Sequence, residues 1–228
     1  MKNTNQGKVR NYVARYCVLT AGLFILAFGV ALSTKAGIGT SPISCPPYVL
    51  SLMTPWTMGE ITIAMHVCFI LLQIALLRKN YQPIQLLQLP IAFVFGFFTD
   101  ITLAMVKDLQ VPNYAMQLVW CFLSIILTAI GVFCEVKADV IMLAGEGTVK
   151  AIADVSHKPF PKMKVVFDCT LVAIAVVISL LGLHRVESVR EGTILSAILV
   201  GIMVNVCDKH IHFVDRIVAY AAAGKKSV

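Results

Sequence analysis

Long runs of apolar residues are the feature that most constrains this chain. Six such runs are flanked by charged residues and are long enough to cross a bilayer, which takes about 20 helical residues. The runs are Tyr16–Thr34, Gly59–Leu77, Gln85–Val106, Tyr114–Cys134, Lys164–Leu183 and Gly192–Cys207. They predict an all-α, polytopic membrane protein with six transmembrane helices between residues 16 and 208.

The composition agrees with this prediction and excludes other classes of protein. Of the 228 residues, 58% are apolar or aromatic and only 14% are charged, whereas a soluble domain carries about 25% charged residues. A soluble enzyme and a disordered chain are therefore excluded. A β-barrel is excluded as well, because its strands alternate between apolar and polar residues. The spans leave no room for a second, extramembrane domain.

The positive charges predict the orientation in the membrane. The net charge of +7 comes from 19 Lys and Arg against 12 Asp and Glu. Most of the basic residues fall on one side of the six spans, together with the N-terminal segment 1–15 and the amphipathic, basic C-terminal tail 209–228. The positive-inside rule places both termini in the cytoplasm. No basic stripe interleaved with aromatic residues lies outside the spans, so we expect the lipid bilayer as a partner and no nucleic acid.

The seven cysteines give no sign of a metal site or a disulfide framework. None forms a C-x-x-C pair, and six of them lie in apolar runs, where Cys acts as a small hydrophobic residue. Cys45 alone lies in a polar, proline-rich stretch, and we expect it to pack there. We expect no metal and no cofactor.

Short segments of the first half of the chain recur in the second half in the same order. Residues 28–36 match residues 130–138 at an offset of 102 (Gly29 to Gly131), with Gly, Val, Lys and Ala identical. Residues 37–40 match 145–148 at an offset of 108, and residues 95–97 match 200–202 at an offset of 105. Chance similarity between apolar, glycine-rich helices is the alternative explanation.

The matches divide the spans into repeat one, about 16–107, and repeat two, about 114–208. Each repeat has three spans, and an odd number turns the second repeat upside down relative to the first. Inverted repeats of this kind are typical of secondary transporters, whose substrate site lies where the two repeats meet.

The Gly-Thr segments predict short helices after the first and fourth spans. In the first, Gly37, Gly39 and Thr40 are followed by Ser41 as N-cap and Pro42 as the first helical residue. Pro46 and Pro47 are expected to limit or kink this helix. In the second, Gly145 and Gly147 precede Thr148, the candidate cap of a helix over Val149–Val155.

A short helix after a glycine loop presents free N–H groups and the positive end of its dipole. Irregular backbone within a membrane protein is tolerated where protein buries it or where it lines a cavity. We therefore expect each half to contain a broken or re-entrant segment that directs backbone donors at an anionic or carboxylate group. The alternative is an amphipathic helix at the membrane surface, with glycines that only permit close packing.

Several ionisable or polar residues lie inside the spans and correspond through the repeat. His66 matches Asp168 at an offset of 102, and Asp100 matches Asn205 at an offset of 105. Such residues are costly in a membrane and usually face the interior of the bundle. His66 and Asp100 are candidates for proton coupling or for handling a cation. Glu146, in the second Gly-Thr segment, is expected to receive a cationic group or to be held by backbone donors.

Each of these residues also has a structural interpretation. Asp100 and Asp168 are close enough to the ends of their spans to be hydrated, His66 is suited to a hydrogen-bonded core position, and Asn205 to a helix-end cap. Glutamines add hydrogen-bonding capacity that a purely structural helix does not need: Gln73, Gln85 and Gln88.

The run GVALSTKAGIGTSPIS at 29–44, with EGT at 146–148 and REGT at 190–193, resembles the bacterial YczE/YyaS/YitT family of integral membrane proteins. The similarity covers almost the whole chain, from about Tyr12 to Asp208. It implies a location in the bacterial cytoplasmic membrane and implies no activity or substrate.

These features together predict a secondary transporter or permease for a small anionic or zwitterionic solute, with the site at the interface of the repeats. The alternative is a non-transporting assembly or regulatory partner, and either function is compatible with a homo-oligomer or a partner membrane protein. No enzyme is expected, because no nucleophile–base pair appears. The candidate site residues are His66, Asp100, Glu146, Asp168, Asn205, Gly37, Gly39, Thr40, Ser41, Gly145, Gly147 and Thr148.

Overall fold

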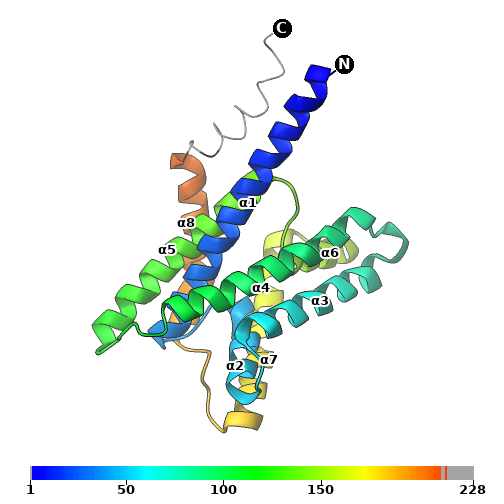
Figure 1. Ribbon diagram of the computed structural model, residues 1–228. Coiled ribbons are helices and arrows are strands. Elements are labelled where there is room, and N and C mark those ends of the chain that lie inside the picture. The colour runs from blue at the N-terminus through cyan, green and yellow to red at the C-terminus, as the bar shows by residue number, and fades with distance from the viewer. Residues whose placement is uncertain (1, 212–213, 215–228) are drawn as a thin grey trace.

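The computed structural model describes the path of residues 2–211 and 214, with side chains from Tyr12 onward (Figure 1). These residues form eight α-helices and three short 3-10 helices, and no β-strand. The α-helices are α1 (Lys2–Ala36), α2 (Cys45–Met53), α3 (Met58–Leu77), α4 (Gln88–Met105), α5 (Tyr114–Ala138), α6 (Ala144–Ser156), α7 (Phe160–Leu183) and α8 (Glu191–His210). The 3-10 helices are η1 (Pro42–Ser44), η2 (Arg78–Asn80) and η3 (Pro83–Leu87).

Six of these helices are long and apolar enough to cross a membrane, which confirms the six predicted apolar spans in the part of the chain described. They are α1, α3, α4, α5, α7 and α8. The two short helices, α2 and α6, follow α1 and α5, where the Gly-Thr segments predict short helices. The predicted basic tail, 209–228, lies mostly outside the described residues.

Most of the helices extend beyond the predicted spans for local reasons. Helix α4 is instead shorter than the predicted Gln85–Val106, since it begins at Gln88, after η3, and ends at Met105. Helix α1 begins at Lys2, because no proline interrupts the residues before the first apolar run. Helix α5 runs on to Ala138 and ends where Asp139 adopts a left-handed conformation. Helix α7 begins at Phe160 with Pro161 in its first turn, where the N–H that proline lacks has no helical acceptor.

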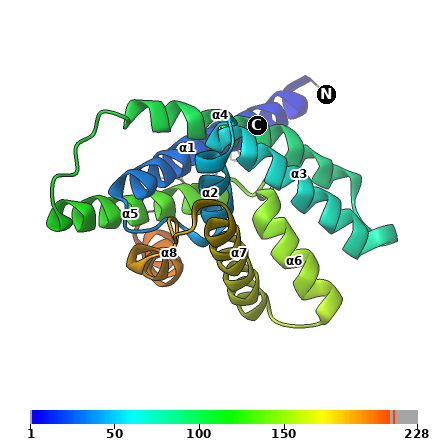
Figure 2. The same cartoon turned by 90° about the horizontal axis from the view of Figure 1, so that it is seen from below.

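Helices α1 and α5 pack side by side and make the most extensive helix–helix contact among the described residues (Figures 1 and 2). Helix α4 packs against α1, and α8 packs against α5. Helices α3 and α4 form a hairpin that also contacts α6, whereas α2 packs against α7. The short helices α2 and α6 each pack against both α3 and α7.

Glycines allow α1 and α5 to approach closely. A Cβ atom on Gly29 would lie 2.5 Å from Thr128 Oγ1, and one on Gly131 would lie 2.7 Å from Leu26 Cβ. Small residues at such crossings are typical of helix packing in membranes, since lipid and apolar side chains offer no hydrophobic gain against each other. The glycines at this crossing are thus packing residues.

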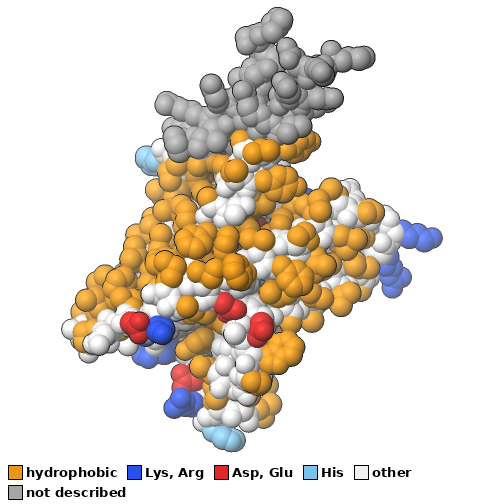
Figure 3. Space-filling model, viewed as in Figure 1, with side chains coloured by type: hydrophobic (Ala, Val, Ile, Leu, Met, Phe, Trp, Pro, Cys, Tyr) orange, Lys and Arg blue, Asp and Glu red, His pale blue; other side chains and the backbone are white. Residues whose placement is uncertain are grey.

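The outer surface is largely apolar, as Figure 3 shows for one face of the molecule. Large apolar side chains are exposed on several of the long helices, among them Phe97 on α4, Leu181 on α7 and Ile194 on α8. Exposed apolar area on this scale is unusual for a soluble protein. It agrees with direct contact between these helices and a lipid bilayer.

We predict that Gly131→Leu destabilises the protein, because the new side chain would displace Leu26 at the crossing of α1 and α5. Overpacking of this kind costs about 1–3 kcal/mol. The matched control is Gly201→Leu on α8, since a Cβ atom there meets nothing within 4 Å. Thermal unfolding in detergent measures both variants, and equal losses in the two would contradict the packing described.

Candidate functional site

The first Gly-Thr segment, residues 37–40, is a loop that the start of α8 holds in place. Gly37 and Gly39 have φ values of 72° and 109°, which favour glycine. The Gly192 N–H donates to the Ile38 carbonyl at 2.7 Å, and the Thr40 N–H donates to the Ser188 carbonyl at 3.1 Å. The non-helical backbone of this segment therefore finds its partners in a distant part of the chain.

Close packing accompanies these hydrogen bonds. A Cβ atom on Gly39 would lie 2.5 Å from Thr193 Oγ1. The Arg190 guanidinium donates to the Gly37 carbonyl at 3.0 Å and pairs with Glu191 at 3.2 Å. The first segment is thus fixed to residues 188–193 by backbone and side-chain contacts.

The Cys45 side chain packs against the first segment. Its sulfur is 3.3 Å from Thr40 Oγ1 and 3.6 Å from the Ser188 carbonyl. Burial raises the pKa of the Cys45 thiol, which keeps it in the unreactive thiol form. The expected packing role of Cys45 agrees with this position.

The prolines after the first segment stand at the starts of two short helices. Ser41 stands at the N-cap position and Pro42 is the first residue of η1, as predicted, but the Ser41 hydroxyl donates to Ser44 and makes no capping bond. From the sequence, Pro46 and Pro47 are expected to limit or kink the helix that begins at Pro42, and this helix, η1, does end at Ser44. The two prolines themselves lie in the first turn of α2, where a missing N–H breaks no helical bond.

The second Gly-Thr segment, residues 145–148, is helical, and the prediction that Thr148 caps a helix starting at Val149 is wrong. Helix α6 begins at Ala144, with Leu143 as its N-cap. The Thr148 hydroxyl lies inside the helix and donates to the Ala144 carbonyl at 2.7 Å. The glycines of this segment serve close packing, which the Gly-x-Gly-Thr pattern alone does not separate from a loop.

A buried pair of glutamine amides holds the second segment. Gln73 Nε2 donates to Gln88 Oε1 at 2.9 Å and to the Ala144 carbonyl at 3.0 Å, and it lies 3.3 Å from Thr148 Oγ1. Gln88 Nε2 returns a bond to Gln73 Oε1 at 3.3 Å. A Cβ atom on Gly147 would lie 2.7 Å from Gln88 Nε2, so a larger residue here would displace the amide from this pair.

The regions around the two segments meet near the middle of the molecule. The Ile43 side chain, from η1, packs so closely against Gly145 that a Cβ atom on this glycine would collide with it. Element η1 also packs against α7. The structure thus brings η1, α6 and α7 to one place.

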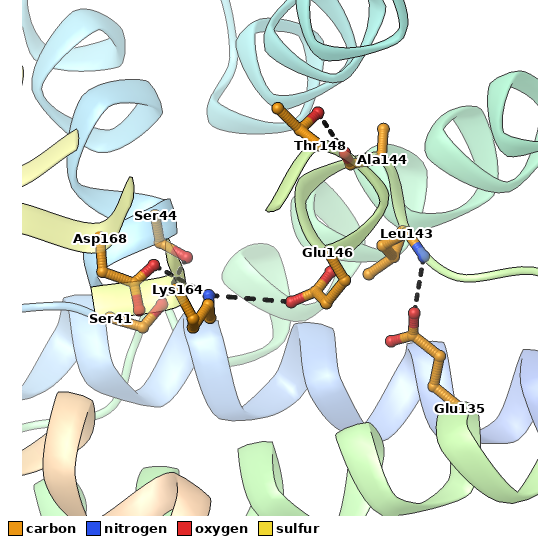
Figure 4. Close-up of polar contacts among 9 residues, drawn as sticks. All are labelled: Ser41, Ser44, Glu135, Leu143, Ala144, Glu146, Thr148, Lys164 and Asp168. Atoms are coloured by element: carbon orange, nitrogen blue, oxygen red, sulfur yellow. Dashed lines mark hydrogen bonds and ion pairs between the residues drawn. The ribbon is translucent and has the colours of Figure 1, made fainter. Parts of the chain in front are cut away.

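A charged cluster lies at this meeting point (Figure 4). We call it the Lys164 cluster and define it as Glu135, Glu146, Lys164 and Asp168. Lys164 Nζ is 2.8 Å from Asp168 Oδ1 and 4.0 Å from Glu146 Oε1. The side chains of Lys164, Asp168 and Glu146 are 30%, 18% and 27% exposed, so the cluster is neither sealed nor fully hydrated.

Ser44 in η1 and Ser41, the N-cap residue of η1, border the cluster. Ser41 donates to Ser44 at 2.9 Å, and Figure 4 shows both beside Asp168 and Lys164. Hydroxyl groups act as donors and as acceptors. They therefore supply neutral hydrogen-bonding groups next to the charges.

The side chain of Glu135, a residue near the end of α5, lies at the N-terminus of α6. Its side chain is buried, and Oε1 accepts a hydrogen bond from the Leu143 N–H at 2.6 Å. A carboxylate at this position is stabilised by the helix dipole. Glu135 is also close enough to interact electrostatically with Glu146 and Lys164. The predicted carboxylate partner of this short helix is thus a residue of the protein itself.

Glu146 is the least satisfied member of the cluster. Its Oε2 atom is shielded from solvent and has no hydrogen-bond partner among the residues described. Its Oε1 atom is 4.0 Å from Lys164, beyond hydrogen-bonding distance. Lys164 thus supplies one ammonium group against the partly exposed acidic side chains of Glu146 and Asp168, and Glu146 retains an unpaired oxygen.

Other predicted site residues lie away from this cluster. Asp100 accepts hydrogen bonds from the Thr57 hydroxyl at 2.7 Å and from the Gly59 N–H at 2.8 Å, at the start of α3. Asn205 is exposed on α8. These contacts give Asp100 a capping position, where the sequence alone left both a functional and a structural role open.

His66 is fully buried between two aromatic rings. Its ring lies 6.0 Å from Phe69 and 5.9 Å from Phe95, measured between centroids. Nδ1 has no hydrogen-bond partner within the described part of the chain. His66 and Asp168, which the sequence matches relate at an offset of 102, therefore lie in different surroundings.

Sequence reasoning missed two members of the cluster, Glu135 and Lys164. Both lie near the ends of apolar runs, where a charge is usually an orientation signal. The spacing of Lys164 and Asp168 was an available sign, since residues four apart lie on one face of a helix. No group of three His, Cys, Asp or Glu in the described residues is placed to hold a metal ion.

Comparisons with known proteins describe the family but no activity. The model of a family described as "Family of unknown function (DUF6198)" matches residues 13–209. "Uncharacterized protein YyaS" of Bacillus subtilis (strain 168) is 27% identical over 193 residues, which cover 84% of this chain and 91% of the relative. No solved structure matches this chain. The YyaS name supports that part of the resemblance, and neither match carries the names YczE or YitT.

We predict that Gln73→Met lowers the stability of the protein by about 1–3 kcal/mol, because it leaves the buried Gln88 amide unpaired. The double variant Gln73→Met/Gln88→Met should recover part of this loss, since both polar partners are then replaced by apolar side chains of similar shape. Thermal unfolding of the single and double variants measures the coupling. Purely additive losses would contradict the amide pair.

Proposed function

The chain belongs to the DUF6198 family, whose function is unknown, and we propose that it is a secondary transporter or permease for a small solute. In this proposal the protein consists of two inverted repeats in the bacterial cytoplasmic membrane, with both termini in the cytoplasm. The solute binds at the Lys164 cluster, and no catalytic step is involved. A zwitterionic solute suits a cluster of mixed charge better than a simple anion.

The observation that carries the proposal is the crosswise docking of the Gly-Thr segments. The first segment belongs to the first half of the chain and docks on Thr193 in the second half. The second segment belongs to the second half and docks on Gln88 in the first half. Gln88 and Thr193 are separated by 105 residues, the offset that also relates Gly96 and Gly201. Two inverted repeats predict this reciprocal arrangement.

The crossing of α1 and α5 supports the same relation. Gly29 lies against Thr128 and Ser124, whereas Gly131 lies against Leu26 and Gly22. A shift of 102 residues converts the first set of positions into the second. Both contacts therefore agree with one two-fold relation between the halves.

The halves differ in the packing of their last two long helices. Gly59 and Gly96 bring α3 and α4 together, whereas Gly201 on α8 faces open space. Alternating access requires such a difference, because the two repeats of a transporter adopt different conformations in any one state.

The two docked segments suit the role of gates on either side of the cluster. With both termini in the cytoplasm, the end of α1 and the start of α8 face the exterior, and so does the first segment. The second segment then faces the cytoplasm, beside the α3–α4 hairpin. In the proposed cycle, release of one docking opens the path on one side while the other docking stays closed.

We predict protein-dependent efflux from proteoliposomes loaded with a defined mixture of amino acids, polyamines and small organic acids. At least one solute should leave about tenfold faster than from protein-free vesicles, a change of about 1.4 kcal/mol in the barrier. Mass spectrometry of the external medium identifies the solute.

The variant Lys164→Gln should reduce this efflux to the background, whereas Lys150→Gln, at an exposed position on α6, should leave it unchanged. A mixture in which no solute leaves faster than from protein-free vesicles would contradict the transporter proposal.

A further inference from the structure

The chemistry that the Lys164 cluster lacks indicates what it binds, provided that the cluster is the solute site proposed above. The N-terminus of α6, which the sequence suggests as an anion site, is already occupied by Glu135 through the Leu143 N–H. The Lys164 ammonium is already paired with Asp168 at 2.8 Å. An added anion would therefore have to displace one of the protein's own carboxylates.

Glu146 supplies the open position. Its Oε2 atom is shielded from solvent and has no partner among the described residues, and its Oε1 atom is 4.0 Å from the Lys164 ammonium. A shielded carboxylate oxygen without a hydrogen-bond donor is unfavourable, and a charged donor satisfies it best. The missing group is therefore a cationic N–H donor.

The Glu146 side chain is open to a bound molecule over only part of its surface. Ile43 and the glutamine pair fill the space beside the adjacent Gly145 and Gly147. The Glu146 and Lys164 side chains are partly exposed. Ser41 and Ser44 lie on the far side of Lys164 (Figure 4), where their hydroxyls offer further donors and acceptors to a bound molecule.

We infer that Glu146 binds a cationic nitrogen, such as the primary ammonium of an aliphatic amine or amino acid. A carboxylate on the same molecule would bind Lys164 and the serine hydroxyls, which makes a zwitterion acceptable. A simple anion is disfavoured, because its charge would meet the Glu146 and Asp168 carboxylates, and the Lys164 ammonium is already paired with Asp168. The expected solute is therefore cationic or zwitterionic, whereas the sequence alone suggests an anionic or zwitterionic one.

Three probes with the same four-carbon chain test the inference: n-butylamine, 4-aminobutyrate and butyrate. A ligand that binds only the folded state raises the midpoint of thermal unfolding. We expect n-butylamine and 4-aminobutyrate to raise it by about 2 °C or more, and butyrate to leave it unchanged.

Variants on one helix locate the effect. Glu146→Gln should abolish the response to both amines, whereas Asp154→Asn, which removes an exposed negative charge from the same helix, should keep it. Glu146→Asp retains the charge on a shorter side chain and should keep a reduced response, which provides a second variant if Glu146→Gln does not fold.

The inference is overturned if butyrate stabilises the protein as much as the amines, if no probe stabilises it, or if Glu146→Gln responds like the wild type. Its failure is distinct from failure of the transporter proposal. Protein-dependent efflux of anions alone would keep the transporter and remove the ammonium site. Stabilisation by the amines without any efflux would keep the site and remove transport.

Discussion

Backbone groups that leave a helix inside a membrane protein need partners from the protein itself, and this constraint governs the rest of the structure. The first Gly-Thr segment satisfies it through Ser188 and Gly192. The second segment is helical and packs against the amides of Gln73 and Gln88, of which Gln73 also donates to the Ala144 carbonyl. In both cases the partner comes from the other half of the chain. The two halves therefore depend on each other at the places where each departs from a long helix.

The same dockings bring costly charges together. Helix α6 is held near the middle of the molecule by Gln73 and Gln88. Element η1 lies beside it, because Ile43 packs against Gly145 and η1 packs against α7. The members of the Lys164 cluster come from three different helices and share the cost of burial by mutual attraction and by the dipole of α6. Charge of this kind is retained in membranes mostly for function, which makes the cluster the best candidate site.

The sequence was sufficient for features that depend on local pattern. Apolar runs predict the six spans, and Ser41 with Pro42 predicts the start of η1. Features that depend on distant contacts were not predictable in this way. Thr148 resembles a cap in sequence but lies inside α6, because Gly145 and Gly147 continue the helix where they pack against η1 and the glutamine pair.

The sequence matches between the two halves also related residues whose surroundings differ. Asp168 pairs with Lys164 in the cluster, whereas His66, which matches it at an offset of 102, is buried between phenylalanine rings. Charges near the ends of spans, such as Glu135, resemble orientation signals, and only the path of the chain after α5 shows that α6 turns back onto this carboxylate. Three-dimensional contacts, rather than residue type or spacing, separate these cases.

The reactivity of Cys45 tests the central claim, that the two dockings open alternately, most directly. In proteoliposomes of uniform orientation, a membrane-impermeant maleimide is added on the exterior side and labelling of Cys45, which is fully buried beneath the first segment, is followed by mass spectrometry. The account predicts that Gly39→Ala, which weakens the first docking, speeds labelling, and that Gln73→Met, which weakens the second, slows it relative to the wild type. Labelling that changes in the same direction in both variants, or in neither, would contradict alternate opening.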